Sequence, residues 1–213
     1  AKQTGIKLSV AHYRRQQSIF LKIKSILDEK IIGEPRLVNL RCWQPHQSDM
    51  IAKTDENWRL DPSVSGGGLF HDLSPHQLDL MIYFFGMPIE TNGIACNAAA
   101  IYNADDTVSG QILFQNKVLF NGSWCFTIDE KQEWCEIVGT KGKMRFSIFE
   151  HQPLVISKNG NDETISFDRL QHVQQPMIET VVQYFIGKAD NPCSADEGVE
   201  VMKLIDRFTG KNE

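Results

Sequence analysis

Three polar side chains that could take part in proton transfer follow a short run of glycines. Asp72, His76 and Asp79 stand at positions i, i+4 and i+7 behind the glycines at 66–68. On one face of a helix this spacing would place the three side chains in a line. An imidazole, with an ordinary pKa of about 6.5, can exchange a proton near neutral pH, and a neighbouring carboxylate would favour its charged form. Because residues 80–85 are apolar, this polar line must face water or line a cleft.

Pro75 affects where the helix that carries these residues begins. Inside a helix, proline removes a backbone donor and clashes with the carbonyl group four residues earlier. A helix that begins with Pro75 at its first position avoids this cost. Ser74 would then be the N-cap and would form a capping box with Gln77, which predicts a helix over 75–85. Asp72 would then lie in a preceding turn or a kinked half-helix, about one turn from His76 in either case.

Periodicity in the first part of the chain predicts a strand, a helix and a second strand. Apolar residues alternate over 5–11, which predicts the strand, and recur at helical spacing over 16–30, which predicts the helix. Gly33 and Pro35, just after this range, would stop the helix. A strand follows over 36–44, and a polar loop over 53–62, long enough to suggest a function, leads to the glycine run.

The pattern then changes to short runs of strand formers separated by turns rich in Gly, Asn and Asp. Such short spacing cannot hold crossover helices, so it predicts an antiparallel, meander-like sheet and an α+β fold. Two helices are expected to close the chain over 176–186 and 195–208, with Ser194 as N-cap of the second. The predicted strands span 89–102, 107–114, 118–126, 133–138, 143–149, 154–157 and 164–167.

The composition of the 213-residue chain is that of an ordinary globular protein, with 41% hydrophobic residues. Its 22 Lys and Arg and 27 Asp and Glu residues form no long run of one sign, which argues against nucleic-acid and membrane-surface partners. No apolar run reaches the roughly 18 residues of a membrane span, and the first residues lack a secretory pattern.

Five widely spaced cysteines, an odd number, favour buried free thiols over a disulfide framework. No Cys-x-x-Cys pair or local His and Cys cluster occurs, so the sequence does not support a metal site. We therefore expect a cytoplasmic protein that binds no metal.

Several segments carry a resemblance to a known family. They are the opening strand that runs into Tyr13-Arg14-Arg15, the turn Gly33-Glu34-Pro35, the stretch from Asn57-Trp58-Arg59 through the glycine run to Asp79, and the hairpin from Glu136 to Lys143. In this order they resemble the carboxy-terminal domain of the Gfo/Idh/MocA family, the glucose-fructose oxidoreductase and inositol dehydrogenase family. The stretch from the glycines to Asp79 is the specific one.

The resemblance implies a fold like the carboxy-terminal domain of glyceraldehyde-3-phosphate dehydrogenase: an open, mainly antiparallel sheet with helices packed on one face. Residues 1–213 would form that single domain. In the family a Rossmann domain that binds NAD or NADP precedes it, but this sequence has no Gly-x-Gly-x-x-Gly after a strand and no Glu-Lys-Pro segment with the family's catalytic lysine. We therefore expect the chain alone to be inactive.

The resemblance also implies roles for individual residues. His76 would be the acid/base that exchanges a proton with a hydroxyl of a sugar, cyclitol or polyol while hydride passes to the nicotinamide, and Asp72 would be its partner. The remaining candidates are Asp79, Arg59, Trp58 and Tyr13 for binding substrate, and Gly67 and Gly68 for approaching the cofactor.

Structural alternatives exist for the same residues. Asp72 could be a capping residue beside a solvated His76, and Asp79 could make a helix–helix hydrogen bond. The glycines could serve only their backbone angles, and the residues at 58–59 could pack on the core.

Two other functions are also compatible with the sequence. One is an NAD-dependent glycoside hydrolase of the same fold, which oxidises its sugar transiently. The other is a non-catalytic module that binds a ligand and assembles through its sheet into a homo-oligomer, because a sheet covered on one face leaves a surface that association could bury.

Overall fold

The computed structural model of the protein describes residues 4–46 and 58–210, so the first half of the polar loop expected at 53–62 lies outside the described residues. The strands are β1 (Pro35–Trp43), β2 (Pro88–Cys96), β3 (Thr107–Phe114), β4 (Leu119–Cys125), β5 (Gln132–Gly139), β6 (Lys143–Phe146), β7 (Leu154–Lys158) and β8 (Asn161–Ile165). They form one eight-stranded sheet in the order β2-β3-β4-β1-β5-β6-β7-β8. Only the β1–β4 pair is parallel among the strand pairs of this described sheet.

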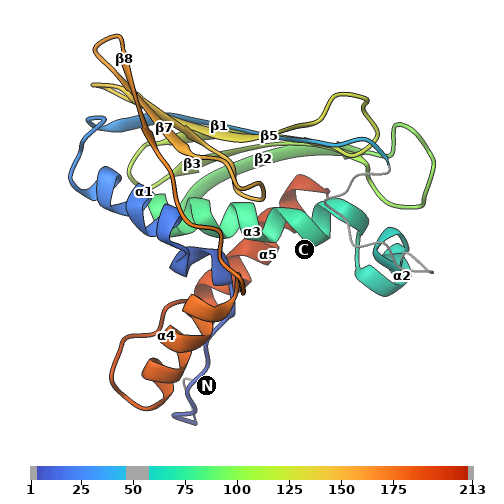
Figure 1. The fold of residues 1–213 in the computed structure, drawn as a ribbon. Coiled ribbons are helices and arrows are strands. Elements are labelled where there is room, and N and C mark those ends of the chain that lie inside the picture. The colour runs from blue at the N-terminus through green and yellow to red at the C-terminus, as the bar shows by residue number, and fades with distance from the viewer. Residues whose placement is uncertain (1–3, 47–57, 211–213) are drawn as a thin grey trace.

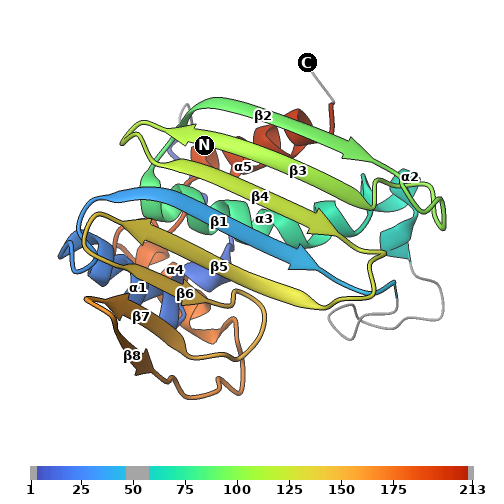
Figure 2. The same ribbon diagram turned by 90° about the horizontal axis from the view of Figure 1, so that it is seen from above.

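The helices gather on one face of the sheet (Figure 1). They are the short η1 (Tyr13–Gln16) and η2 (Trp58–Leu60), and the α-helices α1 (Ser18–Asp28), α2 (Pro62–Ser65), α3 (Gly68–Phe85), α4 (Gln175–Phe185) and α5 (Ala195–Phe208). α3 runs beneath the sheet with α1 and α5 near it, while Figure 2 looks onto the opposite face, over which no described helix lies. The expected α+β class, with an open and mainly antiparallel sheet, is confirmed.

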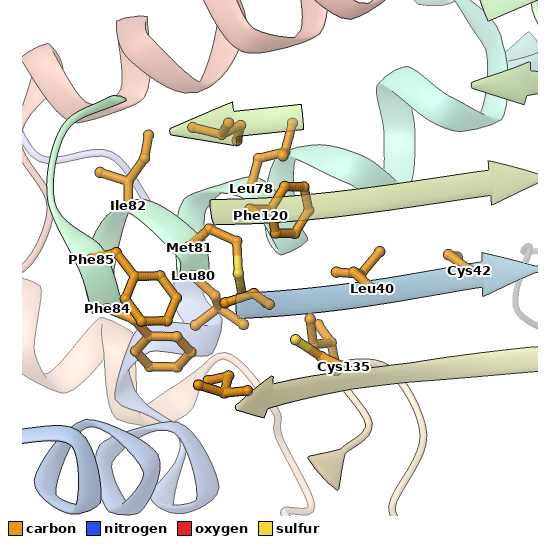
Figure 3. Packing of buried hydrophobic residues seen from close by; sticks show 14 of the residues in the cluster. Leu40, Cys42, Leu78, Leu80, Met81, Ile82, Phe84, Phe85, Phe120 and Cys135 are labelled. Atoms are coloured by element: carbon orange, nitrogen blue, oxygen red, sulfur yellow. The ribbon is translucent and has the colours of Figure 1, made fainter. Parts of the chain in front are cut away.

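The core lies between α3 and the covered face of the sheet. Leu78, Met81 and Phe85 of α3 are buried and lie on the side of the helix toward the strands that carry Leu40 and Phe120 (Figure 3). Along β1 the buried residues alternate with half-buried ones, as expected for a strand with one face in the core. Replacing one of these large side chains with alanine would cost about 2–5 kcal/mol of stability, so the core holds α3 firmly beneath the sheet.

Two glycines of the sheet make room for the last helix. A Cβ atom at Gly93 on β2 would lie 2.5 Å from the Cα of Phe208, and one at Gly110 on β3 would lie 2.2 Å from the ring of the same residue. Both glycines therefore face α5, and Ile94, the next residue after Gly93 on β2, points to the open face.

The prediction of a strand over 5–11 is wrong. This segment is not a strand and pairs with none of the strands of the described sheet. Instead, the amide of Val10 donates to the carbonyl oxygen of Cys193 at 3.0 Å, and the Lys7 ammonium donates to the last carbonyls of α4. The apolar alternation is real, but none of the described strands pairs with this segment.

Side chains decide where two of the strands end. The strand expected over 89–102 ends at Cys96, because the Asp106 carboxylate accepts the amides of Ala98 and Ala99 at 3.0 and 2.8 Å. The strand expected over 143–149 ends at Phe146 because a buried glutamate binds the next amides. Periodicity cannot reveal such capture of backbone groups by distant side chains.

The ends of the helices are predicted with mixed success. α5 has the expected bounds, and Ser194 caps it in a capping box with Glu197. α1 ends at Asp28, so Gly33 lies in the following turn, with φ of +77°, and is not the helix stop. The turn is needed because the chain must reverse into β1 within six residues.

The five thiols are all free, and three of them, Cys42, Cys135 and Cys193, are buried as expected. Cys125 is half-buried, and Cys96 is exposed at the end of β2 because it lies on the open face of the sheet. Among the described helices none is long and apolar enough to cross a membrane. Residues 4–46 and 58–210 also contain no group of three His, Cys, Asp or Glu side chains suited to a metal ion.

Candidate functional site

The glycine run forms the corner at which α3 begins. Gly66 and Gly68 have φ of +85° and +78°, in the left-handed region that favours glycine. A Cβ atom at Gly67 would lie 2.2 Å from the His71 ring, and one at Gly68 would lie 2.5 Å from the Cβ of Ala104. Backbone angle and packing therefore account for these glycines, and the predicted cofactor contact at Gly67 and Gly68 stays a prediction.

α3 begins at Gly68 and runs without a break to Phe85, with Pro75 inside it. The predicted capping box at Ser74 is therefore wrong, since Ser74 is an interior residue whose hydroxyl is buried without a hydrogen-bond partner among the described residues. An interior proline costs a helix about 3 kcal/mol. Leu69 and Phe70, both fully buried in the first turn, offset this cost by packing against the core.

Asp72 belongs to a small cluster at the start of α3. Its carboxylate accepts a hydrogen bond from Nε of Arg59 at 3.2 Å, and the Arg59 guanidinium lies 4.5 Å from the ring centroid of Trp58. The side chains of Asp72 and Arg59 are 38% and 22% exposed, so both remain accessible to a ligand. Three of the residues predicted to bind substrate or take part in catalysis are thus brought together.

His76 lies one helical turn after Asp72, in a niche lined by rings. Its ring centroid is 5.1 Å from that of Tyr13 and 6.3 Å from those of His12 and Phe149. Nδ1 of His76 is buried and has no hydrogen-bond partner in the part of the chain that the structure describes. A buried polar atom without a partner is costly and is a typical place for a functional contact.

The surroundings of His76 favour the neutral imidazole. Burial, followed by the charge of Arg14 and by His12, lowers the pKa of His76 to about 4. The carboxylate expected to favour the charged form, Asp72, hydrogen-bonds Arg59 instead. The expectation that the pKa of His76 lies near neutrality is therefore wrong for this chain. Burial of the imidazole is the largest cause of the lowered pKa, and the Asp72 carboxylate is paired with Arg59.

Asp79 forms a buried ion pair. Its carboxylate accepts three hydrogen bonds from the Arg15 guanidinium, with N–O distances between 2.7 and 3.1 Å. Both side chains are at most 2% exposed. Arg15 also donates to Glu197 at 2.6 Å, so the pair ties η1, α3 and α5 together. Burial alone would lower the pKa of Arg15, but the hydrogen bonds and charge of Asp79 raise it above its ordinary value. The structure favours the helix–helix alternative for Asp79, and a substrate contact gets no support from so buried a carboxylate.

Another buried carboxylate, which the sequence did not single out, positions the ring beside His76. Glu133 on β5 accepts the amides of Ile148 and Phe149 at 3.1 and 3.2 Å and thereby holds the turn after β6. Arg14 closes this turn from outside, since its guanidinium donates to the Ile148 carbonyl oxygen and lies 4.5 Å from the Phe149 ring centroid. The turn is therefore a rigid wall of the niche.

The comparisons with known proteins agree with this fold. The family model described as the GFO/IDH/MocA C-terminal domain matches residues 20–145. This chain belongs to the GFO/IDH/MocA family. Like its relatives in this family, the chain is therefore part of a family of oxidoreductases.

Members of the GFO/IDH/MocA family resemble the chain to different extents. It is 41% identical over 209 residues to Oxidoreductase P35 of Formosa agariphila, a match that covers 98% of this chain and 64% of that protein. It is 33% identical over 88 residues, 41% of this chain and 23% of the relative, to scyllo-inositol 2-dehydrogenase (NADP(+)) IolW of Bacillus subtilis. The chain thus spans less than two thirds of these curated relatives.

The fold is shared with solved structures of the family. A crystal structure of aldose-aldose oxidoreductase from Caulobacter crescentus complexed with glycerol matches all of this chain and 64% of its own, with a TM-score of 0.81 and 16% identity. At this identity the match speaks for the fold alone.

Five of the residues that the family resemblance singled out form two neighbouring groups. Asp72, Arg59 and Trp58 cluster at the start of α3, and Tyr13 contacts His76 one turn further along. His12, Arg14, Glu133 and Phe149 complete the surroundings of His76 and were not predicted to do so. Adjacency to Tyr13 could have pointed to His12 and Arg14, whereas no local signal pointed to Glu133 and Phe149, which lie far from His76 in the sequence.

Proposed function

We propose that this chain is the substrate-side domain of an NAD(P)-dependent oxidoreductase that transfers hydride between nicotinamide and a hydroxyl group of a sugar, cyclitol or polyol. The similarity to an inositol dehydrogenase and to an aldose-aldose oxidoreductase supports the substrate class. The observation that carries the proposal is the half-buried His76 imidazole beside the rings of Tyr13, His12 and Phe149, with its Nδ1 atom buried and unpaired among the described residues.

His76 is proposed to be the general base for alcohol oxidation. With its pKa lowered to about 4, the imidazole is neutral at pH 7 and can accept the hydroxyl proton as hydride leaves the carbon. The charge of Arg14 disfavours the imidazolium that results, so the proton is held weakly and can be passed on. In the reverse reaction the same nitrogen returns the proton to the new alkoxide.

Asp72 is proposed to orient the substrate rather than to hold His76. Its carboxylate has one oxygen on Arg59 and is 38% exposed, which leaves acceptor capacity for a substrate hydroxyl. Arg59, stacked on Trp58, fixes the direction of that carboxylate. Tyr13 borders the niche beside His76 and is proposed to limit the size of the ring that enters.

The nicotinamide cofactor, when bound, accepts or donates the hydride. No Gly-x-Gly-x-x-Gly that could form its main binding site follows a strand in this sequence, and Gly67 and Gly68 are buried at the start of α3. We therefore propose that a preceding dinucleotide-binding domain holds NAD or NADP, and that residues 1–213, a single carboxy-terminal domain, are inactive alone. The five free thiols fit a reducing cytoplasm.

The test is the activity of the full-length protein, which includes the proposed upstream domain. Wild type is expected to reduce NAD⁺ or NADP⁺ with some polyol, and His76→Ala is expected to lower kcat about 10²–10⁴-fold. His172→Ala, at an exposed histidine before α4, serves as the control. Unchanged turnover in His76→Ala refutes the acid/base role, and release of free sugar without net cofactor reduction supports the hydrolase alternative instead.

A further inference from the structure

A cavity that the proposed function does not use lies beside the niche of His76. It measures about 170 Å³ and is enclosed by the start of α1, the turn after β6 and the segment before α4. Pockets for a whole drug-sized ligand measure about 300–1,000 Å³, so this cavity fits a single small group of a ligand. We call it the Arg14 cavity, and its lining includes Arg14, Gln17, Ser18, Ile19, Phe149 and Arg169.

Arg14 brings to this cavity a half-buried positive charge that forms no ion pair with the described residues. Its guanidinium donates to the Ile148 carbonyl oxygen, and its Nε atom is buried without a hydrogen-bond partner over residues 4–46 and 58–210. Arg15 and Arg59, by contrast, each pair with an aspartate of α3. Because a charge taken out of water without a counter-ion is costly, Arg14 favours the binding of an anion.

The acidic residues around the Arg14 cavity are already engaged or face water. Glu133, a buried carboxylate whose charge acts on Arg14, accepts hydrogen bonds from the amides of the turn after β6. Glu150 pairs with Lys131 at 2.6 Å. Asp168 is exposed and is followed in the chain by an exposed arginine. These carboxylates therefore leave the guanidinium available to a ligand.

The start of α1 adds backbone donors to the same cavity. Gln17, the N-cap, makes no side-chain capping hydrogen bond, and the first turn contains no acidic residue. The amides of Ser18 and Ile19 have no hydrogen-bond partner in the part of the chain that the structure describes, as is usual for the first amides of a helix. Helix amino termini favour anions, so these amides and Arg14 supply two kinds of donor to one cavity.

We propose that the Arg14 cavity binds an anionic group, a carboxylate or a phosphate, of the substrate whose hydroxyl reacts at His76. This inference rests on the proposed function and narrows its substrate class to acidic sugars and polyols. Phe149 connects the two sites, because its ring centroid is 4.5 Å from the Arg14 guanidinium and 6.3 Å from that of the His76 ring. One small molecule can therefore reach both.

The position of Arg14 also couples substrate binding to proton transfer. After burial, the charge of Arg14 is the next largest cause of the lowered pKa of His76. An anion bound to Arg14 would offset that charge. His76 is therefore a stronger base when an acidic substrate occupies the cavity than when a neutral polyol is present.

Chemical-shift titration of the 213-residue chain at neutral pH tests the cavity with three probes on a six-carbon frame: sorbitol, sorbitol 6-phosphate and gluconate. At least one of the two anionic probes is expected to shift the amide signals of Ser18 and Ile19 and to bind about 10-fold more tightly than sorbitol. Equal binding of the three probes overturns the proposal. Inorganic phosphate that binds as tightly as the better anionic probe also overturns it, because the cavity would then be a free-anion site only.

Two variants and a control locate the anion. Ser18→Glu adds a carboxylate to the first turn of α1, which the helix dipole favours, so the variant folds while it repels the anion. This variant and Arg14→Gln are expected to lower the affinity for the anionic probe to that for sorbitol. Val199→Glu, which adds the same charge at an exposed residue of α5, is expected to keep it. Unchanged affinity in Ser18→Glu overturns the proposal even where Arg14→Gln does not fold.

Turnover by the full-length protein separates this inference from the proposed function. With an acidic polyol, Ser18→Glu is expected to raise KM about 10-fold with a smaller effect on kcat, whereas His76→Ala lowers kcat. Cofactor reduction that is equally efficient with neutral and acidic polyols refutes the anion site alone. Binding of an anionic probe at Ser18 without cofactor reduction by any polyol refutes the proposed function and leaves the anion site in place.

Discussion

His76 and Asp72 lie one turn apart on the same helix, yet each has its own partners. Asp72 binds Arg59, whereas His76 lies among the rings of Tyr13, His12 and Phe149. Spacing along a helix determines which side chains are near one another, but the distant residues that fold against them determine their protonation. The lowered pKa of His76 comes from burial and from Arg14, a residue 62 positions earlier in the sequence.

The pKa of His76 can be measured by NMR titration of its ring protons in the 213-residue chain. It is expected to be about 4 and to rise toward 6.5 in Arg14→Gln, because a positive charge is removed while burial remains. Arg36→Gln, at an exposed arginine of β1, is expected to leave it unchanged. A wild-type value near 6.5 would contradict the description of the niche.

The same shift predicts how stability depends on pH. The unfolded chain has the ordinary histidine pKa of about 6.5, so between pH 6.5 and pH 4 it binds more protons than the folded protein. Stability is therefore expected to fall as the pH is lowered through this window. In His76→Gln the slope of unfolding free energy against pH, measured with urea, is expected to be smaller.

The two aspartates of α3 should differ sharply in their effect on stability. Asp79→Asn is expected to cost about 3–5 kcal/mol, because it leaves the Arg15 charge buried with a weakened partner. Asp72→Asn is expected to cost at most about 1 kcal/mol, because the Arg59 pair is partly exposed. Urea denaturation measures both, and similar losses would mean that Asp79 is not the structural member of the pair.

Among the elements, α3 begins earlier than the sequence predicts because its first turn packs against the core, although that turn carries no local helix-start signal. Ser74 and Pro75 form a convincing helix start in the sequence, yet Leu69 and Phe70 are fully buried and extend the helix back to Gly68. β3, α5 and the hairpins were predictable because their periodicity and caps are local. β2 and β6 were predicted too long because the side chains that end them come from elsewhere in the chain.

Two glycines at the start of α3 offer a matched comparison. Both have positive φ, but a Cβ atom at Gly66 would meet nothing within 4 Å, whereas one at Gly68 would lie 2.5 Å from Ala104. Gly66→Ala is expected to cost about 1–2 kcal/mol from backbone strain, and Gly68→Ala about 1–3 kcal/mol more from overpacking. Equal losses of unfolding free energy would show that the corner can relax around the added methyl group.

At the scale of the whole molecule, the sheet is covered on one face only (Figure 2). On the open face, the Arg41 guanidinium lies between the rings of Trp43 and Trp134, at 4.5 and 5.1 Å from their centroids, and Ile94 is 74% exposed. Large half-buried side chains of this kind are typical of the centre of protein interfaces. We therefore propose that the homo-oligomer forms through this face.

Light scattering after size exclusion tests the proposed assembly. The wild-type chain is expected to elute as a dimer or a larger oligomer, and Ile94→Glu, which introduces a charge on the open face, is expected to shift it toward the monomer. Val64→Glu, at a residue 65% exposed on α2, should not change the mass. A monomeric wild type at micromolar concentration would contradict association through the sheet.

The fold class, most elements, the family resemblance and the residues of α3 that could carry chemistry were all predictable, because they depend on local spacing and composition. The tertiary structure decided the partners: Arg59 for Asp72, Arg15 for Asp79, and a niche of rings beside Arg14 for His76. It also left segment 5–11 without a sheet to join. Burial and contacts between residues far apart in the chain set these outcomes, and no local pattern in the sequence records them.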